Sequence, residues 1–330
     1  MEADTMKAII AEGYGNHDVL KLKNIAIPKP TENKVLVKVH ACSATRADVM
    51  MLSGKPYFSR LFLGIRKPKY PIPGTGFAGE VVEVGSSVLK FTIGDAVFGE
   101  TTLGFSTNTE YVTVPEDGVI LHKPENLSYA DAAPFCDGHL TSINFLKEIG
   151  NIKPGQKVLI NGASGSLGMA AVQLAKYFGA EVTGVCSTAN VRLVKSLGAD
   201  HTIDYKKNDF TKSENRYDII YDTIGSSSFR KSKRILTNKG VYISPVLKSS
   251  LLLQMIRTSI LGSRKAKFGA SGLKSKDELR ALLLELLEIF KSGKLKTVID
   301  RQFPLEKVAH AHQYIATGHK KGNVVIIVES

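Results

Sequence analysis

The fold of this chain is decided by residues 158–168, which read Val-Leu-Ile-Asn-Gly-Ala-Ser-Gly-Ser-Leu-Gly. An apolar run leads into glycines at positions 162, 165 and 168, and a helix-favouring segment, residues 169–177, follows. This order predicts a strand, a tight turn and a helix whose free N–H groups and positive dipole end face a pyrophosphate. We therefore predict a dinucleotide site instead of an ordinary strand–helix turn. Its expected contacts are Gly162, Ser164, Gly165, Ser166 and Leu167.

The residues after the next predicted strand indicate which dinucleotide is bound. That strand covers residues 181–186, and its end lies about 20 residues after the glycines, where an NAD site carries an acidic residue. This chain has Ser187 and Thr188 there, and Arg192 follows on a predicted helix. Hydroxyls and a guanidinium bind a 2′-phosphate, whereas a carboxylate repels it. The sequence therefore favours NADP(H). The alternative is that Arg192 and Lys195 only form a solvated helix face.

Composition is that of an ordinary soluble globular protein. The 330 residues suffice for two domains, and 43% of them are hydrophobic and 23% charged. The three cysteines, Cys42, Cys136 and Cys186, form no CxxC pair, which fits a reducing cytosol and argues against a disulfide framework. The sequence shows no signal-peptide pattern and no apolar run of membrane-spanning length. We expect a cytoplasmic protein without stable membrane insertion.

The formal net charge of +13 raises the question of nucleic-acid binding. Lysines and arginines occur along the whole chain, with concentrations at residues 60–69, 230–234 and 264–267. None of these concentrations shows the aromatic spacing of an RNA-binding sheet or heads a recognition helix. A basic surface that attracts a polyanionic cofactor explains the charge better. We therefore expect no nucleic-acid partner.

The pattern of apolar residues divides the chain into an α/β domain and a β-rich domain. Residues 1–127 contain short apolar runs between turns, which predict a small barrel or a strongly curved sheet. Residues 128–292 alternate between strands and helices, as in a Rossmann doubly wound parallel sheet. One helix is predicted over residues 129–149. Residues 293–330 return to strand character.

Motifs along the whole chain resemble the medium-chain dehydrogenase/reductase superfamily, and within it the zinc-free quinone oxidoreductase-like branch. These motifs are specific for the fold and much less so for the substrate. The resemblance implies a GroES-like catalytic domain that is split between residues 1–127 and 293–330. It also implies a cofactor and substrate bound between the two domains, and a homodimer joined through edge strands near residues 265–270. The motifs are residues 35–41, 73–82, 94–99, 153–156, 197–200, 203–205, 222–225 and 321–325.

The resemblance also bears on zinc. Zinc-dependent members hold a catalytic metal at positions that match Thr45, Thr75 and Asp137 in this sequence. A catalytic zinc takes three protein ligands, usually imidazole or thiolate, and the two threonines supply neither. Cys42 and Cys136 are displaced from these positions, and we interpret them as small core residues. We therefore predict no metal site.

A metal-free site restricts the chemistry. Zinc normally acts as the Lewis acid in alcohol and aldehyde interconversion, so the substrate here has to be electron-poor already or be polarised by a hydroxyl or a water. Quinones and enones are electron-poor, and we predict NADPH-dependent reduction of a quinone, an enone or a related activated carbonyl by hydride transfer. Two alternatives are a metal-free NADP-dependent alcohol dehydrogenase and a non-enzymatic NADPH-binding structural or signalling protein.

The resemblance implies roles for further residues. Thr45 matches a residue that can hydrogen-bond a substrate oxygen, and Asp48 one that orients its neighbours, although Asp48 is equally expected as a helix-capping carboxylate. Tyr57 lies near enough in sequence to serve as an acid, or it forms part of the rim. The remaining expected cofactor contacts are Thr141, Tyr205, Ile224, Gly225, Asn323 and Val325.

Two segments of the sequence depart from what a minimal member of the family contains. Residues 57–69 mix aromatic, aliphatic and basic side chains and are expected to form a lid. Residues 247–267 are apolar and basic together. We expect this second segment to be a substrate-channel helix, and the alternative is a helix that lies on a membrane surface.

Overall fold

The computed structural model describes residues 4–55, 57, 60–102 and 105–328, which form two compact units. The first unit comprises Met1–Asp137, Ser275–Arg280 and Thr297–Ser330. The second unit comprises Gly138–Lys274 and Ala281–Lys296. The chain therefore leaves the first unit and returns to it, and the second unit is an insertion. The sequence predicted that the α/β domain begins at residue 128 and that the chain returns to strand character at residue 293.

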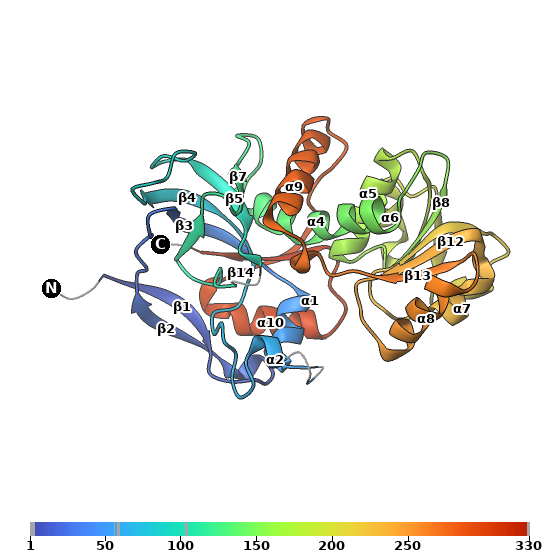
Figure 1. Ribbon diagram of the computed structural model, residues 1–330, viewed down its shortest axis with the longest axis horizontal. Helices are drawn as coiled ribbons and strands as arrows, with labels where there is room; N and C mark the ends of the chain where they lie inside the picture. Colours follow the sequence, from blue (N-terminus) through green and yellow to red (C-terminus); the bar gives the residue numbers. More distant parts are fainter. Residues whose placement is uncertain (1–3, 56, 58–59, 103–104, 329–330) are drawn as a thin grey trace. The chain divides into compact units, whose positions relative to one another are not determined.

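The second unit is built on a parallel sheet with the Rossmann strand order (Figure 1). Its six strands are ordered β10-β9-β8-β11-β12-β13, so the first strand in the chain, β8, lies in the middle. All five strand pairs are parallel. The predicted doubly wound parallel sheet is confirmed. The strands are β8 (Lys157–Asn161), β9 (Glu181–Cys186), β10 (His201–Asp204), β11 (Tyr217–Asp222), β12 (Leu236–Ser244) and β13 (Lys265–Phe268).

Helices connect these strands. Helix α5 (Ser166–Tyr177) follows the glycine loop, and eight of its residues are buried, as expected of a helix packed on a sheet. Helix α9 (Lys276–Lys291) is divided between the two units. Further helices of the second unit are α4 (Gly138–Ile143), the π-helix η5 (Asn144–Ile149), α6 (Val191–Ser196), α7 (Phe229–Ser232) and α8 (Ser249–Ile260).

The single helix predicted over residues 129–149 is wrong in detail. The structure has α3 (Tyr129–Ala132), the 3-10 helix η4 (Ala133–Cys136), then α4 and η5. Pro134 lies in the first turn of η4 and has no N–H to donate. Asp137 then leaves the helical region, with φ −96° and ψ −82°. Apolar periodicity alone does not reveal this break, which separates the last residue of the first unit from the first residue of the second.

The first unit is built on a mostly antiparallel sheet in which β3 (Lys34–Ala44) is the central strand. The N-terminal part of β3 pairs with β6 (Tyr111–Pro115), and its C-terminal part pairs with β15 (Asn323–Ile327). Along its other edge β3 pairs with β4 (Gly76–Val84), with two register shifts. Such irregularities bend a sheet. The remaining strands are β14 (Ile299–Pro304), β5 (Ala96–Glu100), β7 (Val119–His122) and the separate hairpin of β1 (Thr5–Ala11) and β2 (Leu20–Ala26).

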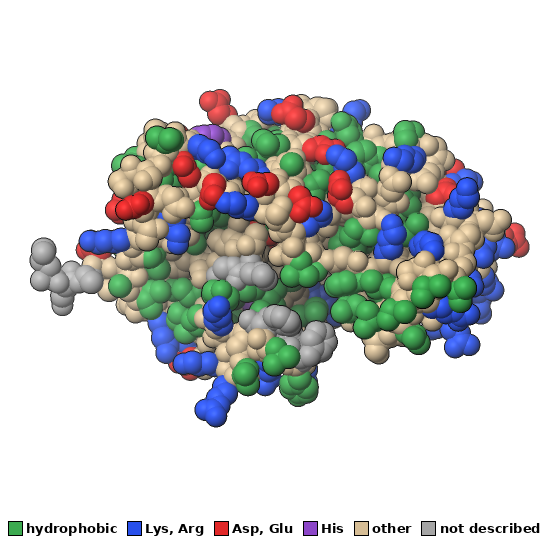
Figure 2. Space-filling model, viewed as in Figure 1, with side chains coloured by type: hydrophobic (Ala, Val, Ile, Leu, Met, Phe, Trp, Pro, Cys, Tyr) green, Lys and Arg blue, Asp and Glu red, His purple; other side chains and the backbone are tan. Residues whose placement is uncertain are grey.

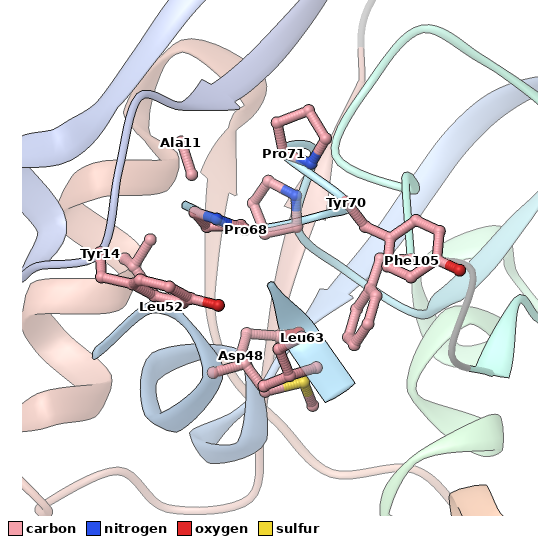
Figure 3. A pocket seen from close by; sticks show the side chains of 11 residues that line it. Ala11, Tyr14, Asp48, Leu52, Leu63, Pro68, Tyr70, Pro71 and Phe105 are labelled. Atoms are coloured by element: carbon pink, nitrogen blue, oxygen red, sulfur yellow. The ribbon is translucent and has the colours of Figure 1, made fainter. Parts of the chain in front are cut away.

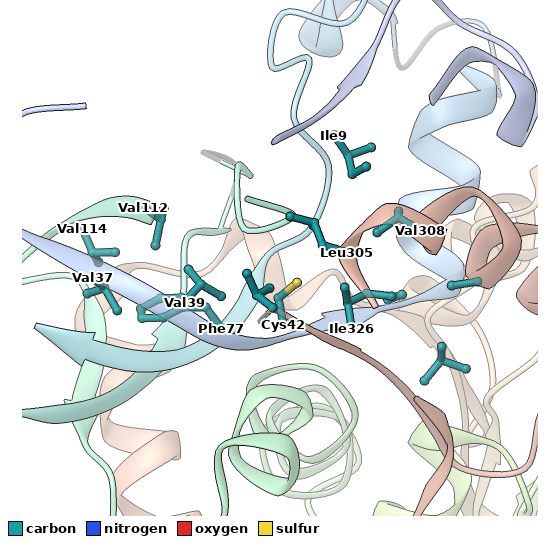
Figure 4. Close-up of a cluster of buried hydrophobic side chains, with 14 of the residues drawn as sticks. Ile9, Val37, Val39, Cys42, Phe77, Val112, Val114, Leu305, Val308 and Ile326 are labelled. Carbon is teal, nitrogen blue, oxygen red and sulfur yellow. The ribbon is translucent and has the colours of Figure 1, made fainter. Parts of the chain in front are cut away.

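One apolar core holds the early and late parts of the first unit together (Figure 4). Ile9, Cys42 and Phe77 from the first 137 residues are buried with Val308 and Ile326 from the C-terminal segment. Burial of Cys42 confirms its interpretation as a core residue, and Cys136 and Cys186 are buried as free thiols too. Helix α10 (Val308–Ala316) contributes Val308 to this core. Among the described residues, no helix has the length and apolar character needed to cross a membrane.

Candidate cofactor site and catalytic groups

Two of the three glycines in the loop after β8 are required by the backbone itself. Gly162 has φ +81°, a conformation that L side chains rarely adopt. A Cβ atom at Gly168 would lie 2.1 Å from the carbonyl oxygen of Gly162. Helix α5 can therefore approach the end of β8 only if residue 168 is glycine. These two residues build the turn.

Gly165 is different, because nothing in the described protein requires it to be glycine. A Cβ atom there would meet only the Gly162 oxygen, at 3.5 Å, which is an ordinary contact. Gly165 is also the N-cap of α5, and no side chain caps this end of the helix. The space beside Gly165 and the N-terminal amides of α5 are therefore left for another group. A pyrophosphate fits this arrangement.

Neighbouring side chains hold the loop in place. The Nδ2 atom of Asn190 donates to Oγ of Ser164 over 3.0 Å. On the other side, the Ser142 hydroxyl donates to the carbonyl oxygen of Leu167 over 2.8 Å, which ties α4 to the start of α5. Thr141, next to Ser142, is the one residue of α4 that is not buried. Thr141 therefore lies next to a residue that is bound to the start of α5, the helix predicted to bind the pyrophosphate.

Ile224 and Gly225 lie at the other flank of the loop. A Cβ atom at Gly162 would lie 2.9 Å from Cγ2 of Ile224, so the Ile224 side chain stands against the turn. Gly225 has φ +66°, and a Cβ atom there would clash with Val246 at 2.7 Å. The backbone angle and the Val246 side chain thus explain why residue 225 is glycine. Ile224 is 43% exposed and remains available to a ligand.

The residues predicted to bind the adenosine end lie together at the end of β9. The backbone N–H of Tyr205 donates to the carbonyl oxygen of Cys186 over 3.1 Å, which places Tyr205 next to Ser187. Tyr205 and Thr188 are exposed, as is Arg192 near the start of α6. A hydroxyl pair, an aromatic ring and a guanidinium are therefore presented on one side of the sheet's carboxyl edge.

The sequence analysis missed Asp204 at this place. The Thr188 hydroxyl donates to Oδ2 of Asp204 over 2.6 Å, and this hydrogen bond is the main cause that lowers the pKa of the carboxyl. The backbone N–H of Lys206 donates to Oδ1, and the Lys207 charge also favours the ionised form. The signal was present, because Asp204 ends the strand that pairs with β9 opposite Cys186. A carboxylate and two lysines thus accompany the predicted hydroxyls.

In the first unit, Thr45 and Asp48 form a capping box at the start of α1 (Arg46–Ser53). Oδ2 of Asp48 accepts from both the backbone N–H and the hydroxyl of Thr45, each over 2.7 Å. The Asp48 N–H in turn donates to Oγ1 of Thr45 over 3.2 Å. Asp48 therefore has the capping role that the sequence analysis considered. The Thr45 hydroxyl has to leave this carboxylate before it can donate to a substrate oxygen.

Asp48 also forms one wall of a small cavity inside the first unit (Figure 3). The volume is about 40 Å³, which accommodates a water molecule but no organic substrate. The other described lining side chains are apolar or aromatic and include Tyr14, Tyr70 and Phe105. Burial in these surroundings raises the pKa of Asp48. The cavity is therefore too small to be the substrate site as it stands.

Tyr57 is not among the residues that line this cavity. Its ring lies 4.9 Å from the guanidinium carbon of Arg60, and the Tyr14 ring lies 4.3 Å from the same atom. The Tyr57 side chain is 67% exposed. The structure thus places Tyr57 in a cation–π contact at the surface. Residues 58 and 59 of the predicted lid region lie outside the described residues, and α2 (Arg60–Leu63) follows them.

Asn323 and Val325 lie on β15, beside the end of β3. Val325 is in register with Ser43, and Val324 with Ala44, the residue before Thr45. Asn323 is 5% exposed and donates from Nδ2 to the carbonyl oxygen of Val298 over 3.1 Å. The Val325 side chain is completely buried. Only backbone atoms of Val325 are therefore available for the predicted cofactor contact.

A second group of polar side chains surrounds Gly76 in the first unit. The Thr75 hydroxyl donates to Oδ1 of Asp137 over 3.3 Å. A Cβ atom at Gly76 would lie 2.7 Å from Oγ of Ser43 and 3.0 Å from Oδ2 of Asp137. The absence of a side chain at Gly76 therefore leaves room for Ser43 and the Asp137 carboxyl. The sequence analysis named Asp137 only as a position related to zinc.

The pKa values of the ionisable side chains in this region are shifted toward neutral pH. Burial raises the pKa of Asp137 to about 7, helped by the nearby Asp48 charge. Burial likewise raises the pKa of Glu100 to about 8, and the nearby Asp137 charge adds to this shift. Burial lowers the pKa of Lys320 to about 8. Three groups in one region whose pKa values lie near neutral pH are typical of sites that exchange protons at neutral pH.

Comparison with known proteins identifies the family. Residues 31–125 match the alcohol dehydrogenase GroES-like domain, and residues 197–326 match a domain family described as zinc-binding dehydrogenase. The chain is 34% identical to 2-methylene-furan-3-one reductase of Solanum lycopersicum, over 97% of this chain and 79% of the relative. The chain belongs to the quinone oxidoreductase-like branch of the medium-chain dehydrogenases/reductases. It is an oxidoreductase that uses a nicotinamide cofactor.

Two further relatives of this medium-chain reductase agree with this assignment. It is 31% identical to the chloroplastic NADPH-dependent alkenal/one oxidoreductase of Arabidopsis thaliana, over 97% of this chain and 79% of the relative. The solved structure of a quinone oxidoreductase from Coxiella burnetii is 30% identical, with a TM-score of 0.87, over 99% of this chain and 100% of the other. Both predicted folds, the Rossmann and the GroES-like domain, are therefore confirmed.

The family's zinc positions carry oxygen donors in this reductase. They are Thr45, whose hydroxyl donates to Asp48, and Thr75, whose hydroxyl donates to Asp137. Across the part of the chain that the structure describes, no three His, Cys, Asp or Glu side chains are grouped as metal ligands. The hydroxyl–carboxyl pair of Thr75 and Asp137 is suited to hold and pass a proton.

Proposed function

We propose that this protein is an NADPH-dependent reductase of quinones, enones or related activated carbonyls. The observation that carries the proposal is Gly165, which the protein backbone does not require and which leaves room beside an uncapped helix N-terminus. The bound cofactor supplies a hydride at its nicotinamide ring. The second unit positions the cofactor through its phosphates.

Support for NADP(H) comes from the end of β9. Ser187, Thr188 and Arg192 offer hydroxyls and a guanidinium to a 2′-phosphate. Asp204 opposes this preference, but the Lys206 backbone binds its carboxylate and Lys207 lies within its electrostatic reach. We infer that the positive groups prevail and that NADPH binds more tightly than NADH.

Support for an electron-poor substrate comes from the chemistry of the first unit and from the relatives. Thr45 and Thr75 supply hydroxyls, which activate a carbonyl less strongly than a metal does. Substrates that are already electron-poor, such as quinones and enones, do not need stronger activation. The names of the relatives include an alkenal/one oxidoreductase and a quinone oxidoreductase. We therefore infer reduction of these classes without a metal.

Reduction by hydride also consumes a proton, and we infer that Asp137 supplies it. A carboxyl with a pKa of about 7 is protonated in half of the molecules at neutral pH. Asp137 gives its proton to the oxygen or carbon that becomes negative as hydride arrives, and it is protonated again from solvent. Thr75 keeps the carboxyl oriented through its hydrogen bond.

A steady-state assay of NADPH oxidation with a panel of quinones, enones and alcohols tests this function. We expect turnover with quinones or enones, with kcat/KM at least tenfold higher for NADPH than for NADH. Arg192→Gln should reduce this ratio, whereas Lys195→Gln on the same helix serves as a matched control. Tight NADPH binding with no turnover on any acceptor would contradict the enzymatic proposal.

The role of Asp137 is tested by the pH dependence of kcat. We expect the wild-type rate to fall above a pH of about 7, as the carboxyl loses its proton. Asp137→Asn should lower kcat by about 10²-fold or more and remove this dependence. Asp137→Glu should restore part of both. An unchanged pH profile in Asp137→Asn would show that another group supplies the proton.

The homodimer and the cytoplasmic location remain predictions. β13 lies at the edge of the sheet, paired only with β12 among the described strands, as the predicted dimer through residues 265–270 requires. The lysines of this strand are held by the chain itself: the ammonium groups of Lys265 and Lys267 donate to the carbonyl oxygens of Thr258 and Ile149.

A further inference from the structure

The positive charge of this protein is concentrated in one part of the second unit. Residues 223–274 contain 11 of the 44 lysines and arginines and none of the 31 acidic residues, so the rest of the chain is almost neutral. This segment includes α7, β12, α8 and β13. Its charge excess is therefore a property of one surface region and does not reflect the whole molecule.

Helix α8 in this region has two apolar faces. Leu251 and Met255 face the core of the second unit, and the Thr258 hydroxyl accepts a hydrogen bond from the Ala266 N–H over 3.1 Å. These residues lie four and three positions apart, on one face of the helix, and attach it to the sheet. The opposite face is apolar too and is exposed. It consists of Leu252, Leu253, Ile256 and Ile260, of which Ile260 is 78% exposed.

A basic groove lies beside the exposed face. It has a volume of about 650 Å³ and is lined by Arg230, Lys233, Arg257 and Arg264, among others. None of the described lining residues is acidic. Arg264 is held in place, since its Nε donates to the carbonyl oxygens of Leu236 and Thr237. The lower right of Figure 2, over α7 and α8, is covered mainly by hydrophobic and basic side chains.

An exposed Leu/Ile stripe flanked by arginines and lysines is the pattern of a helix that lies in the surface of an anionic membrane. The alternatives fit less well. Single-stranded nucleic acid needs exposed aromatic rings for stacking. In this segment Phe229 and Tyr242 are buried, and the half-buried Phe268 packs against the core of the second unit. A second copy seated on this face of α8 would bring the basic groove close to its own copy, which is repulsive. The predicted dimer instead uses the outer edge of β13, whose lysines are bound by carbonyl oxygens of the same chain.

We propose that the second unit docks on anionic lipid bilayers through α8. The four exposed aliphatic side chains enter the boundary between headgroups and acyl chains. The arginines and lysines of the groove bind lipid phosphates. The contact is peripheral, because α8 spans only Ser249–Ile260, too short to cross a bilayer. This inference does not depend on the proposed reductase activity.

Vesicle co-sedimentation of the full-length protein tests the proposal. We expect binding to phosphatidylcholine vesicles that contain about 30% phosphatidylglycerol, and little binding to phosphatidylcholine alone. Salt at about 0.5 M should weaken the binding strongly, because it screens the charges. Failure to bind the anionic vesicles at low salt would overturn the proposal.

Two double variants separate the apolar face from the charge. Leu253→Ser with Ile256→Ser, and Arg230→Gln with Lys233→Gln, should each weaken vesicle binding at least tenfold. The matched controls are Leu89→Ser, which changes a leucine that is 91% exposed in the first unit, and Lys29→Gln with Lys294→Gln. The controls should bind as the wild type does. Circular dichroism and NADPH affinity should stay unchanged in every variant.

The remaining outcomes overturn the proposal. If the serine variant binds vesicles as the wild type does, the contact is electrostatic alone and α8 does not enter the membrane. If that variant instead turns a dimer into a monomer in size-exclusion chromatography and no form binds vesicles, the face joins two copies. If an oligonucleotide binds but anionic vesicles do not, the basic groove serves nucleic acid.

Discussion

At the scale of single residues, the three loop glycines do different work. Gly162 and Gly168 are needed for the turn, through a positive φ and a contact of 2.1 Å between a would-be Cβ and a carbonyl oxygen. Gly165 has ordinary backbone angles, with φ −86°, and open space around its missing Cβ. The sequence pattern treats the three alike. The structure separates the two glycines that the turn needs from the one that has open space around it.

This separation predicts opposite effects of two alanine substitutions. Gly165→Ala should leave the melting temperature nearly unchanged and weaken NADPH binding at least tenfold, because the new methyl occupies the space of the pyrophosphate. Gly168→Ala should lower the melting temperature by several degrees, because its Cβ meets backbone.

Calorimetry and titration of NADPH fluorescence measure both effects, and the absence of tryptophan makes the fluorescence signal easy to interpret. Gly272→Ala is the matched control, since nothing lies within 4 Å of its would-be Cβ. If Gly165→Ala bound NADPH as tightly as the wild type, the pyrophosphate would have to lie elsewhere.

At the scale of elements, helix α10 shows how burial changes a titratable side chain. His310 and His312 lie on this helix two residues apart, and His310 is exposed whereas His312 is 1% exposed. Burial lowers the pKa of His312 to about 4. The neutral imidazole is therefore the folded form. Only the packing of the helix distinguishes the two histidines.

The buried histidine predicts a pH-dependent stability. Because the folded state disfavours protonation of His312, its contribution is complete above pH 6.5 and is lost as the pH falls from 6.5 toward 4. The loss amounts to about 3 kcal/mol at most. His312→Gln should flatten the fall of the urea midpoint between pH 7.5 and 5, measured by tyrosine fluorescence. His310→Gln should behave as the wild type, and identical curves for both variants would refute the assignment.

At the scale of the whole molecule, the first unit is assembled from the two ends of the chain. β15 lies between β14 and β3, and its residues Val324 and Ile326 are buried in the same core as Val37 and Phe77. The resemblance to a known family predicted a split catalytic domain. The strand pairings show why the split is stable: β4 covers one edge of the C-terminal part of β3, and among the described strands only β15 covers the other edge.

Removal of residues 297–330 should therefore unfold the first unit and spare the second. The truncated chain loses β14, α10 and β15, which exposes the β3 edge and the core beside it. Limited proteolysis should then yield a resistant fragment that begins near residue 138 and ends near 296. A chain ending at residue 328 is the control and should resist cleavage in both units. Equal resistance of the first unit in the truncated chain would contradict this assembly.

The sequence by itself determined the glycine turn, the alternation of strands and helices, and the residues at the end of β9. These features are local, because periodicity and turn chemistry act over a few residues. It missed Asp204 and the break at Asp137. The tertiary structure alone decided that the Asp48 carboxyl is buried, that the pKa values of Asp137 and Glu100 are shifted toward neutrality, and that one face of α8 stays uncovered. Burial and the meeting of distant segments set these properties, and neither is encoded within a short stretch of chain.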